Sequence, residues 1–244
     1  MLPILAKHFP DTIKTYWEPF VGGGAVLYYL STQVQRSVIC DVNETLITIY
    51  LIMRDHVEDL IECLQGYFDR HKHDRRYFKG VLVKPLIYPL DTAARCLYAL
   101  YLSFSHKVDF RRDGSFNASL GLRRWIGLFR PDILRASSRA LQNTDIYHGD
   151  YRMFTNPLPG DLVFADPPYD NVKGIYINDF DHTAQIALRD KMDEWCNNGA
   201  TVIQTNADTP LIRDLYQDYR LIPNVTTSQF CAGKNRQVRE VIIV

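Results

Sequence analysis

The chain has 244 residues, and 46% of them are apolar, which is enough to bury one sizeable core. Its 28 basic and 28 acidic residues cancel, and this balance by itself argues weakly against a polyanionic partner. No apolar stretch approaches the roughly 20 residues of a membrane helix, and the N-terminus lacks the pattern of a signal peptide, so we expect a cytoplasmic protein without a membrane segment.

The first part of the chain has an α/β pattern. Residues 15–30 have the order of a short strand, a glycine turn and an apolar helix. A buried strand at 37–40 then ends in Asp41, and Asn43 is a good N-cap for the next helix. This order predicts one βαβ unit.

From residue 55 to residue 141 the pattern changes to helices, with apolar residues spaced by about 3.6 positions. A turn-rich stretch at 110–117 contains Asp113-Gly114, a pair typical of β-hairpins. Residues 70–135 hold 14 Lys or Arg and 5 acids, a net charge of +9, which leaves −9 for the remainder. This basic segment suggests a face for a polyanion, although an ordinary solvated helical surface explains it equally well.

The α/β pattern resumes after residue 141. We therefore expect residues 1–54 and 142–244 to form one α/β domain, with 55–141 inserted as a mainly helical lobe. The elements predicted in the last part are strands at 145–147, 162–165 and 200–204, a helix at 184–195, and closing strands at 219–225 and 239–244.

The cysteines and histidines favour neither a disulfide framework nor a metal site. The five cysteines are odd in number, lie far apart and form no CxxC pair, which is typical of reduced thiols. His71 and His73 stand in a run of charged residues, so we expect them on a solvated helix face rather than at a zinc ion. We therefore expect no metal.

The glycine turn and the acid after the second strand form a first candidate site. Glycines at a strand-to-helix turn let a ligand approach the backbone, and a carboxylate such as Asp41 can bind ribose hydroxyl groups. Tight packing alone would also explain such a turn. The sixth residue counted from Gly22 is Leu27, so the GxGxxG pattern is absent and a dinucleotide oxidoreductase is disfavoured.

The segment Asp166-Pro167-Pro168-Tyr169, directly after the apolar strand at 162–165, is the most specific signal. Prolines cannot extend a central strand, so they make a stiff rim with free carbonyl groups at its carboxyl end. Asp166 and the Pro167 carbonyl can both accept hydrogen bonds from an exocyclic purine amine and make its nitrogen more nucleophilic towards a sulfonium methyl group. Tyr169 offers a ring on which an extruded base can stack. A plain Pro-Pro turn would explain neither the acid nor the aromatic ring.

The chain resembles the Dam-type DNA adenine-N6 methyltransferases in four segments, which are, in order, Glu18-Pro-Phe-Val-Gly-Gly-Gly24, Asp41-Val-Asn43, Phe116-Asn117 and Asp166-Pro-Pro-Tyr169. The resemblance covers nearly the whole chain. It implies an α/β fold with a Rossmann-like class I methyltransferase sheet, a reversed last strand, and an inserted target-recognition lobe that contains a β-hairpin. It also implies S-adenosyl-L-methionine as cofactor, double-stranded DNA as partner, a short palindromic target such as GATC, and a nucleoid-associated protein, which we expect to be a monomer.

The resemblance further implies roles for individual residues. The catalytic residues would be Asp166, Pro167, Pro168 and Tyr169. The cofactor-binding residues would be Glu18, Phe20, Gly22, Gly24, Asp41, Asn43, Asp150 and Asp166, with Asp41 at the ribose and Asp150 at the adenine ring.

The residues around the predicted hairpin are candidates for DNA binding, because such a hairpin can enter the major groove. We expect Arg111 or Arg112 to contact a base and Arg123 and Arg124 to contact phosphates. The full set of candidates is Lys107, Arg111, Arg112, Asn117, Arg123 and Arg124.

The sequence departs from the family pattern in two places. Family members usually begin with a segment ending in Gly-Gly-Lys, which is not found ahead of Met1, and the stretch at 105–121 looks shorter than the usual recognition hairpin and has an aspartate where an arginine is expected. An alternative is therefore a catalytically silent DNA-binding or partner subunit. N4-cytosine and protein-glutamine methyltransferases more often have Ser-Pro-Pro-Tyr and Asn-Pro-Pro-Tyr, and a C5-cytosine enzyme is excluded because no cysteine follows a proline.

Overall fold

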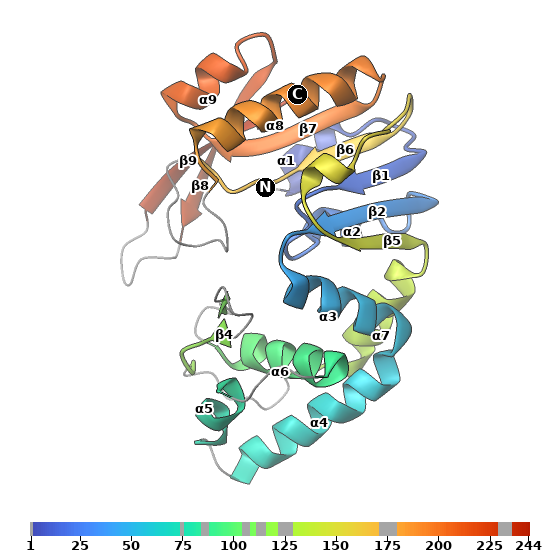
Figure 1. Ribbon diagram of the computed structural model, residues 1–244, viewed down its shortest axis with the longest axis vertical. Coiled ribbons are helices and arrows are strands. Elements are labelled where there is room, and N and C mark those ends of the chain that lie inside the picture. The colour runs from blue at the N-terminus through green and yellow to red at the C-terminus, as the bar shows by residue number, and fades with distance from the viewer. Residues whose placement is uncertain are drawn as a thin grey trace. The chain divides into compact units, whose positions relative to one another are not determined.

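The computed structural model describes residues 2–73, 76–83, 88–103, 108–110, 116–121, 129–170, 180–228 and 236–244 (Figure 1). The chain consists of two compact units. Unit 1 comprises Met1–Val42 and Asn143–Val244, and unit 2 comprises Asn43–Gln142. Helix α3 (Glu44–Asp55), which the sequence analysis assigned to the first α/β segment, packs against helices of unit 2 and is grouped with them.

Unit 1 is built on a seven-stranded sheet with the order β5-β2-β1-β6-β7-β9-β8. β1, β2, β5, β6 and β7 run parallel to one another, whereas β9 is antiparallel to both β7 and β8. The predicted α/β sheet with a reversed last strand is therefore confirmed. The strands are β1 (Thr15–Glu18), β2 (Arg36–Asp41), β5 (Thr144–His148), β6 (Leu162–Ala165), β7 (Thr201–Ala207), β8 (Leu221–Ser228) and β9 (Arg236–Ile243).

The main core of unit 1 lies where α8 (His182–Asn197) and α9 (Pro210–Leu215) pack against the sheet (Figure 1). Alternate residues of a strand face opposite sides of a sheet, so only every second strand residue contributes to this core. Trp195 of α8 is fully buried there, and its Nε1 atom donates a hydrogen bond of 2.7 Å to the Phe154 carbonyl. The other helices of unit 1 are short: α1 (Leu2–Leu5), η1 (Ala6–His8), α2 (Ala25–Leu30) and η3 (Tyr151–Met153).

Unit 2 is mainly helical, as predicted for the inserted lobe. Its helix α6 packs against α3, α4 and α5, and α7 packs against α3 and α4. A short antiparallel pair, β3 with β4, brackets the predicted hairpin turn, whose residues 111–115 lie outside the described residues. The elements besides α3 are α4 (Val57–His73), α5 (Tyr77–Leu82), α6 (Pro89–Leu102), β3 (Asp109–Phe110), β4 (Phe116–Asn117) and α7 (Pro131–Leu141).

The expectation of a solvated helix face is wrong for His71. Its side chain is 2% exposed, and its Nδ1 atom lies 2.8 Å from the Tyr98 hydroxyl group of α6. The buried stripe of Leu60, Leu64 and Phe68 on α4 reaches His71 at helical spacing, so packing of the helix buries the imidazole despite its charged sequence neighbours.

No helix in the part of the chain that the structure describes is long and apolar enough to cross a membrane. The described residues also contain no group of three or more histidine, cysteine or acidic side chains placed to hold a metal ion. Cys40, Cys63, Cys96 and Cys196 are free thiols, while Cys231 lies outside the described residues.

Candidate active site

The glycine turn joins β1 to α2 and is tied to the end of β2. Gly22 and Gly24 have φ angles of 46° and 65°, which residues other than glycine rarely adopt. Apart from the two adjacent residues, no described residue has an atom within 4 Å of the place where a Cβ atom of Gly22 would stand, so these residues leave space beside this backbone. The Gly22 N–H group donates a hydrogen bond of 3.1 Å to Asp41 Oδ2. The structure therefore brings together the turn and the acid that the sequence analysis combined.

Three carboxyl groups at the ends of neighbouring strands form what we call the acid cluster: Glu18 of β1, Asp41 of β2 and Asp166 after β6. Glu18 is 2% exposed, and its Oε2 atom has no hydrogen-bond partner among the described residues. Burial raises the pKa of Glu18 well above its ordinary range, and the charges of Asp166 and Asp41 raise it further, against hydrogen bonds that lower it.

None of the described groups that shift the pKa of Glu18 is basic. A buried carboxyl group with an unused oxygen and negatively charged neighbours is costly, because neither a hydrogen bond nor a positive charge compensates that oxygen. The acid cluster therefore fits a ligand that brings positive charge and hydrogen-bond donors.

Asp166 lies directly after β6 and is oriented by β7. Thr205 Oγ1 donates a hydrogen bond of 2.5 Å to Asp166 Oδ1. The Asp166 side chain is accessible to solvent, yet the protein around its carboxyl group desolvates it and raises its pKa, while hydrogen bonds with Thr205 and Tyr169 lower the pKa in part. Burial also raises the pKa of Tyr169, so its hydroxyl group stays protonated. Asp166 is thus a fixed acceptor whose charge depends on pH.

The two prolines after Asp166 differ in what their carbonyl groups contact. The Pro168 carbonyl accepts a hydrogen bond of 2.9 Å from Gln185 Nε2 of α8. The Pro167 carbonyl accepts none from the residues that the structure describes. The carboxyl group of Asp166 and the carbonyl of Pro167, on consecutive residues, therefore remain as acceptors for an amine.

An aromatic cluster lies beside the glycine turn. The ring of Phe20 is 5.3 Å from that of Tyr151 in η3 and 5.9 Å from that of Phe180, measured between centroids. Phe180 stands shortly before α8, and its ring is 6.3 Å from Tyr151. These contacts fix the predicted cofactor residue Phe20 from two sides.

Asp150 and Asn43 have local capping roles in the structure. Asp150 accepts a hydrogen bond of 3.0 Å from the Arg152 N–H group and pairs with the Arg152 guanidinium group at 3.0 Å. Asn43 caps α3 by accepting from the Leu46 N–H group over 3.2 Å, as its sequence position predicted. Asn43 belongs to unit 2, whereas the acid cluster belongs to unit 1, and the cofactor roles of both residues stay predictions.

The structure describes one of the six residues predicted to bind DNA. Asn117 is exposed on β4, opposite Asp109. Lys107, Arg111, Arg112, Arg123 and Arg124 lie outside the described residues.

Sequence reasoning missed the residues that hold the Asp166–Tyr169 turn from behind. Thr205 and Asn206 lie on β7, and Gln185 lies on α8, far from the turn in the sequence. The strand predicted at 200–204 ended just before Thr205, whereas β7 extends to Ala207. The only signal that could have identified Thr205 and Asn206 is their place at the end of this strand, combined with knowledge of the strand order in the sheet.

Comparison with known proteins gives consistent matches. Residues 1–229 match the family model described as D12 class N6 adenine-specific DNA methyltransferase. The chain is 27% identical to the type II methyltransferase M1.LlaDCHI of Lactococcus lactis subsp. cremoris, over 100% of this chain and 90% of that protein. It is 25% identical to the retron Ec67 DNA adenine methylase of Escherichia coli, over 98% and 85% of the two chains. It is 28% identical to the DNA N-6-adenine-methyltransferase of Escherichia phage P1, but matches only 33% of that protein.

Proposed function

Because the chain belongs to the D12 class N6 adenine-specific DNA methyltransferase family, we propose that it methylates an adenine extruded from duplex DNA, with S-adenosylmethionine as methyl donor and a short palindrome such as GATC as target. The family makes the chain a DNA adenine methyltransferase. The donor, the extrusion of the base and the target sequence are the parts that the proposal adds.

The acid cluster supports the choice of donor. S-adenosylmethionine carries a sulfonium and an ammonium group, and it supplies a methyl group on the sulfonium when it is bound. Glu18, with its unused buried oxygen, would hold the ammonium end, and Asp41 would bind the ribose hydroxyl groups. Gly22 leaves open space for this ligand at the backbone.

The turn after β6 supports the chemistry on adenine. The lone pair of the N6 amine is delocalised into the purine ring, so the amine is a poor nucleophile. Asp166 and the Pro167 carbonyl would each accept a hydrogen bond from N6, which favours a tetrahedral nitrogen with an available lone pair. Thr205 holds the Asp166 carboxylate in place for this bond, and Asp166 is the first acceptor for the proton that N6 loses. Tyr169 would stack on the extruded base, worth roughly 1–3 kcal/mol.

The basic lobe supports binding to DNA. Residues 70–135 carry a net charge of +9 in a chain whose total charge is zero. Such a concentration of positive charge is what neutralises DNA phosphates. We therefore assign DNA binding to residues 55–141, and catalysis to residues 1–54 and 142–244.

The observation that carries the proposal is the pair of acceptors on consecutive residues after β6: Asp166, which Thr205 holds in place, and the Pro167 carbonyl, which accepts no hydrogen bond from the described residues. The test is methyl transfer from radiolabelled S-adenosylmethionine to a duplex with one GATC site. Label should enter this duplex, but not the same duplex whose GATC adenines already carry an N6-methyl group.

A variant separates chemistry from binding in the same assay. Asp166→Ala should abolish methyl transfer and largely keep the binding of cofactor and DNA, whereas Asp145→Ala, on an exposed ion pair of β5, should behave like wild type. Wild-type rates for Asp166→Ala would refute the mechanism. Label in the pre-methylated duplex would refute the target.

A further inference from the structure

Two buried side-chain amides lie behind the Asp166–Tyr169 turn. Gln185 of α8 and Asn206 of β7 are both 0% exposed. Asn206 Nδ2 donates a hydrogen bond of 3.0 Å to Gln185 Oε1, and Gln185 Nε2 donates one of 2.9 Å to the Pro168 carbonyl. We call this pair the amide relay.

The backbone fixes the orientation of both amides. Asn206 Oδ1 accepts from the Asp170 N–H group over 3.0 Å and from the Ala207 N–H group over 2.8 Å, so this atom must be the oxygen. The nitrogen of Asn206 then faces the oxygen of Gln185, which leaves the nitrogen of Gln185 for the Pro168 carbonyl. Flipping either amide would set two donors or two acceptors against each other.

The relay holds the two peptide groups that flank Tyr169. Gln185 fixes the carbonyl between Pro168 and Tyr169, and Asn206 fixes the N–H group between Tyr169 and Asp170. The proline rings already restrict the φ angles of Pro167 and Pro168. Because both flanking peptide groups are held, the Tyr169 side chain can change its direction only slightly. The same holds for the neighbouring Pro167 carbonyl.

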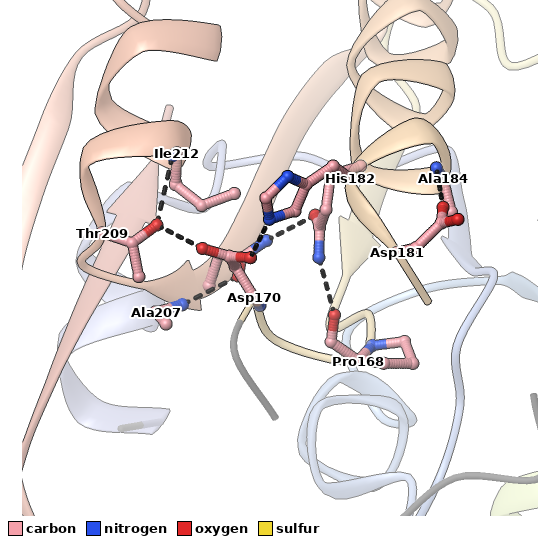
Figure 2. A network of polar contacts seen from close by, with 10 residues as sticks. Pro168, Asp170, Asp181, His182, Ala184, Ala207, Thr209 and Ile212 are labelled. Atoms are coloured by element: carbon pink, nitrogen blue, oxygen red, sulfur yellow. Dashed lines mark hydrogen bonds and ion pairs between the residues drawn. The ribbon is translucent and has the colours of Figure 1, made fainter. Parts of the chain in front are cut away.

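Asp170 gives the turn a second anchor. It is 4% exposed, accepts a hydrogen bond of 2.7 Å from Thr209 Oγ1, and lies 3.5 Å from His182 Nε2 (Figure 2). Thr209 also accepts from the Ile212 N–H group at the start of α9. The segment after the turn is therefore tied to the beginnings of α8 and α9.

We propose that Gln185 and Asn206 are positioning residues for methyl transfer: the amide relay occupies the Pro168 carbonyl, leaves the Pro167 carbonyl for the amine, and sets the angle of the Tyr169 ring. This inference rests on the proposed function, in which Asp166, Pro167 and Tyr169 contact the extruded adenine. The relay acts through the turn and touches neither substrate nor cofactor.

The first experiment is Gln185→Met, assayed by steady-state methyl transfer. A small misplacement of acceptors lowers the rate of the chemical step, so kcat should fall about 10- to 100-fold while KM for S-adenosylmethionine and for DNA changes little. The matched control is Gln204→Met. Gln204 is equally buried on β7, but its Oε1 atom accepts from the Tyr216 hydroxyl group, which lies outside the turn. This variant should lose stability with kcat close to wild type.

The second experiment gives a signature that lower stability does not produce. In Q185E the protonated carboxyl group has both a donor for the Pro168 carbonyl and an acceptor for Asn206, whereas the ionised form has no donor. Burial raises the pKa of the introduced carboxyl group. The kcat of Q185E should therefore approach wild type on the acid side and fall as pH rises, with a limb that is absent from wild type and from Gln185→Met.

The outcomes are distinguishable. Thermal unfolding of each variant is followed over the same pH range, and the assay temperature is kept below every midpoint. A folded Gln185→Met protein with wild-type kcat, or a Q185E profile parallel to wild type, overturns the positioning role. If Asp166→Ala also keeps activity, the proposed function itself has failed. If Asp166→Ala is inactive and the Gln185 variants are not, only the present inference fails.

Discussion

At the scale of single residues, Thr205 favours the charged form of Asp166. Desolvation by the surrounding protein raises the pKa of the Asp166 carboxyl group, and the hydrogen bond from Thr205 lowers it. Removing the hydroxyl group by Thr205→Val should therefore raise the pKa of Asp166 further. Because the ionised form accepts the amine hydrogen bonds, the acid limb of kcat should move to higher pH. A pH–rate profile measures this shift.

Thr201→Val is the matched control for that profile, because it makes the same exchange on the same strand at the end away from Asp166. Its acid limb should coincide with that of wild type. An unshifted limb in Thr205→Val would show that Thr205 does not tune Asp166.

We expect Glu18 to support cofactor binding at a cost in the stability of the folded protein. The raised pKa of Glu18 in the folded state means that the folded protein holds this proton more tightly than the unfolded chain does. Stability is therefore lost as pH rises above the unfolded value of about 4.3. Glu18→Gln should remove this loss, so the variant should unfold at a higher temperature than wild type at neutral pH, with no difference below about pH 4.

The same variant should bind S-adenosylmethionine more weakly, because an amide cannot balance the ammonium charge. Calorimetric titration measures the affinity, and scanning calorimetry measures the midpoint. Glu62→Gln, an exposed change on α4, should alter neither quantity. Unchanged affinity in Glu18→Gln would move the ammonium site elsewhere.

At the scale of elements, Thr209 links the start of α9 to the active-site turn. It caps the helix at the Ile212 N–H group and donates to the buried Asp170 carboxylate. Thr209→Ala removes both bonds, and we expect a loss of about 1–2 kcal/mol in the free energy of unfolding, measured with urea. Thr209→Ser keeps the hydroxyl group and should stay within about 0.5 kcal/mol of wild type. Equal losses in both variants would contradict this assignment.

The elements with strong local patterns were predicted from the sequence. The apolar run at 162–165 coincides with β6, and the glycine turn lies between β1 and α2 as expected. Helix α9 was missed because it is only six residues long, although Thr209 followed by Pro210 is a helix-start signal. The buried position of His71 was missed because charge was weighed above helical spacing.

The candidate site was predicted only where its residues are close in sequence. Asp166–Tyr169 and the Gly22–Asp41 pairing follow from motifs and strand ends. The supports at Gln185, Thr205 and Asn206 depend on which strand lies next to β6, and no local pattern states this. Tertiary hydrogen bonds of this kind can be identified only once the fold is known.

At the scale of the whole molecule, charge-neutralising substitutions should show which part of the chain binds DNA. Neutralising Lys107, Arg111, Arg112, Arg123 and Arg124 together should weaken DNA binding and reduce the salt dependence of the affinity, by up to about one unit of slope for each phosphate that is no longer neutralised. Fluorescence anisotropy over a range of salt concentrations measures both. Neutralising Arg36, Lys191 and Arg213, which form ion pairs in unit 1, should leave the slope unchanged.

The outcome that would contradict the lobe assignment is an unchanged slope in the five-residue variant. Single substitutions distinguish side chains that contact bases from side chains that contact phosphates. Removing a base-reading side chain at Arg111 or Arg112 should cost roughly 1–3 kcal/mol on the cognate site only, whereas removing a phosphate-binding side chain at Arg123 or Arg124 should weaken all sequences alike.

The interruption of unit 1 also sets the order in which the protein can fold. β2 and β5 are paired neighbours, yet the whole of unit 2 lies between them in the chain. Pairing them early would require closing a very long loop, and the entropy of loop closure slows such a step. Unit 2 is rich in local helical contacts and can form before that loop closes. A nascent chain emerging from the ribosome should therefore acquire a protease-resistant unit 2 while β2 still lacks its neighbour β5 and β1 its neighbour β6.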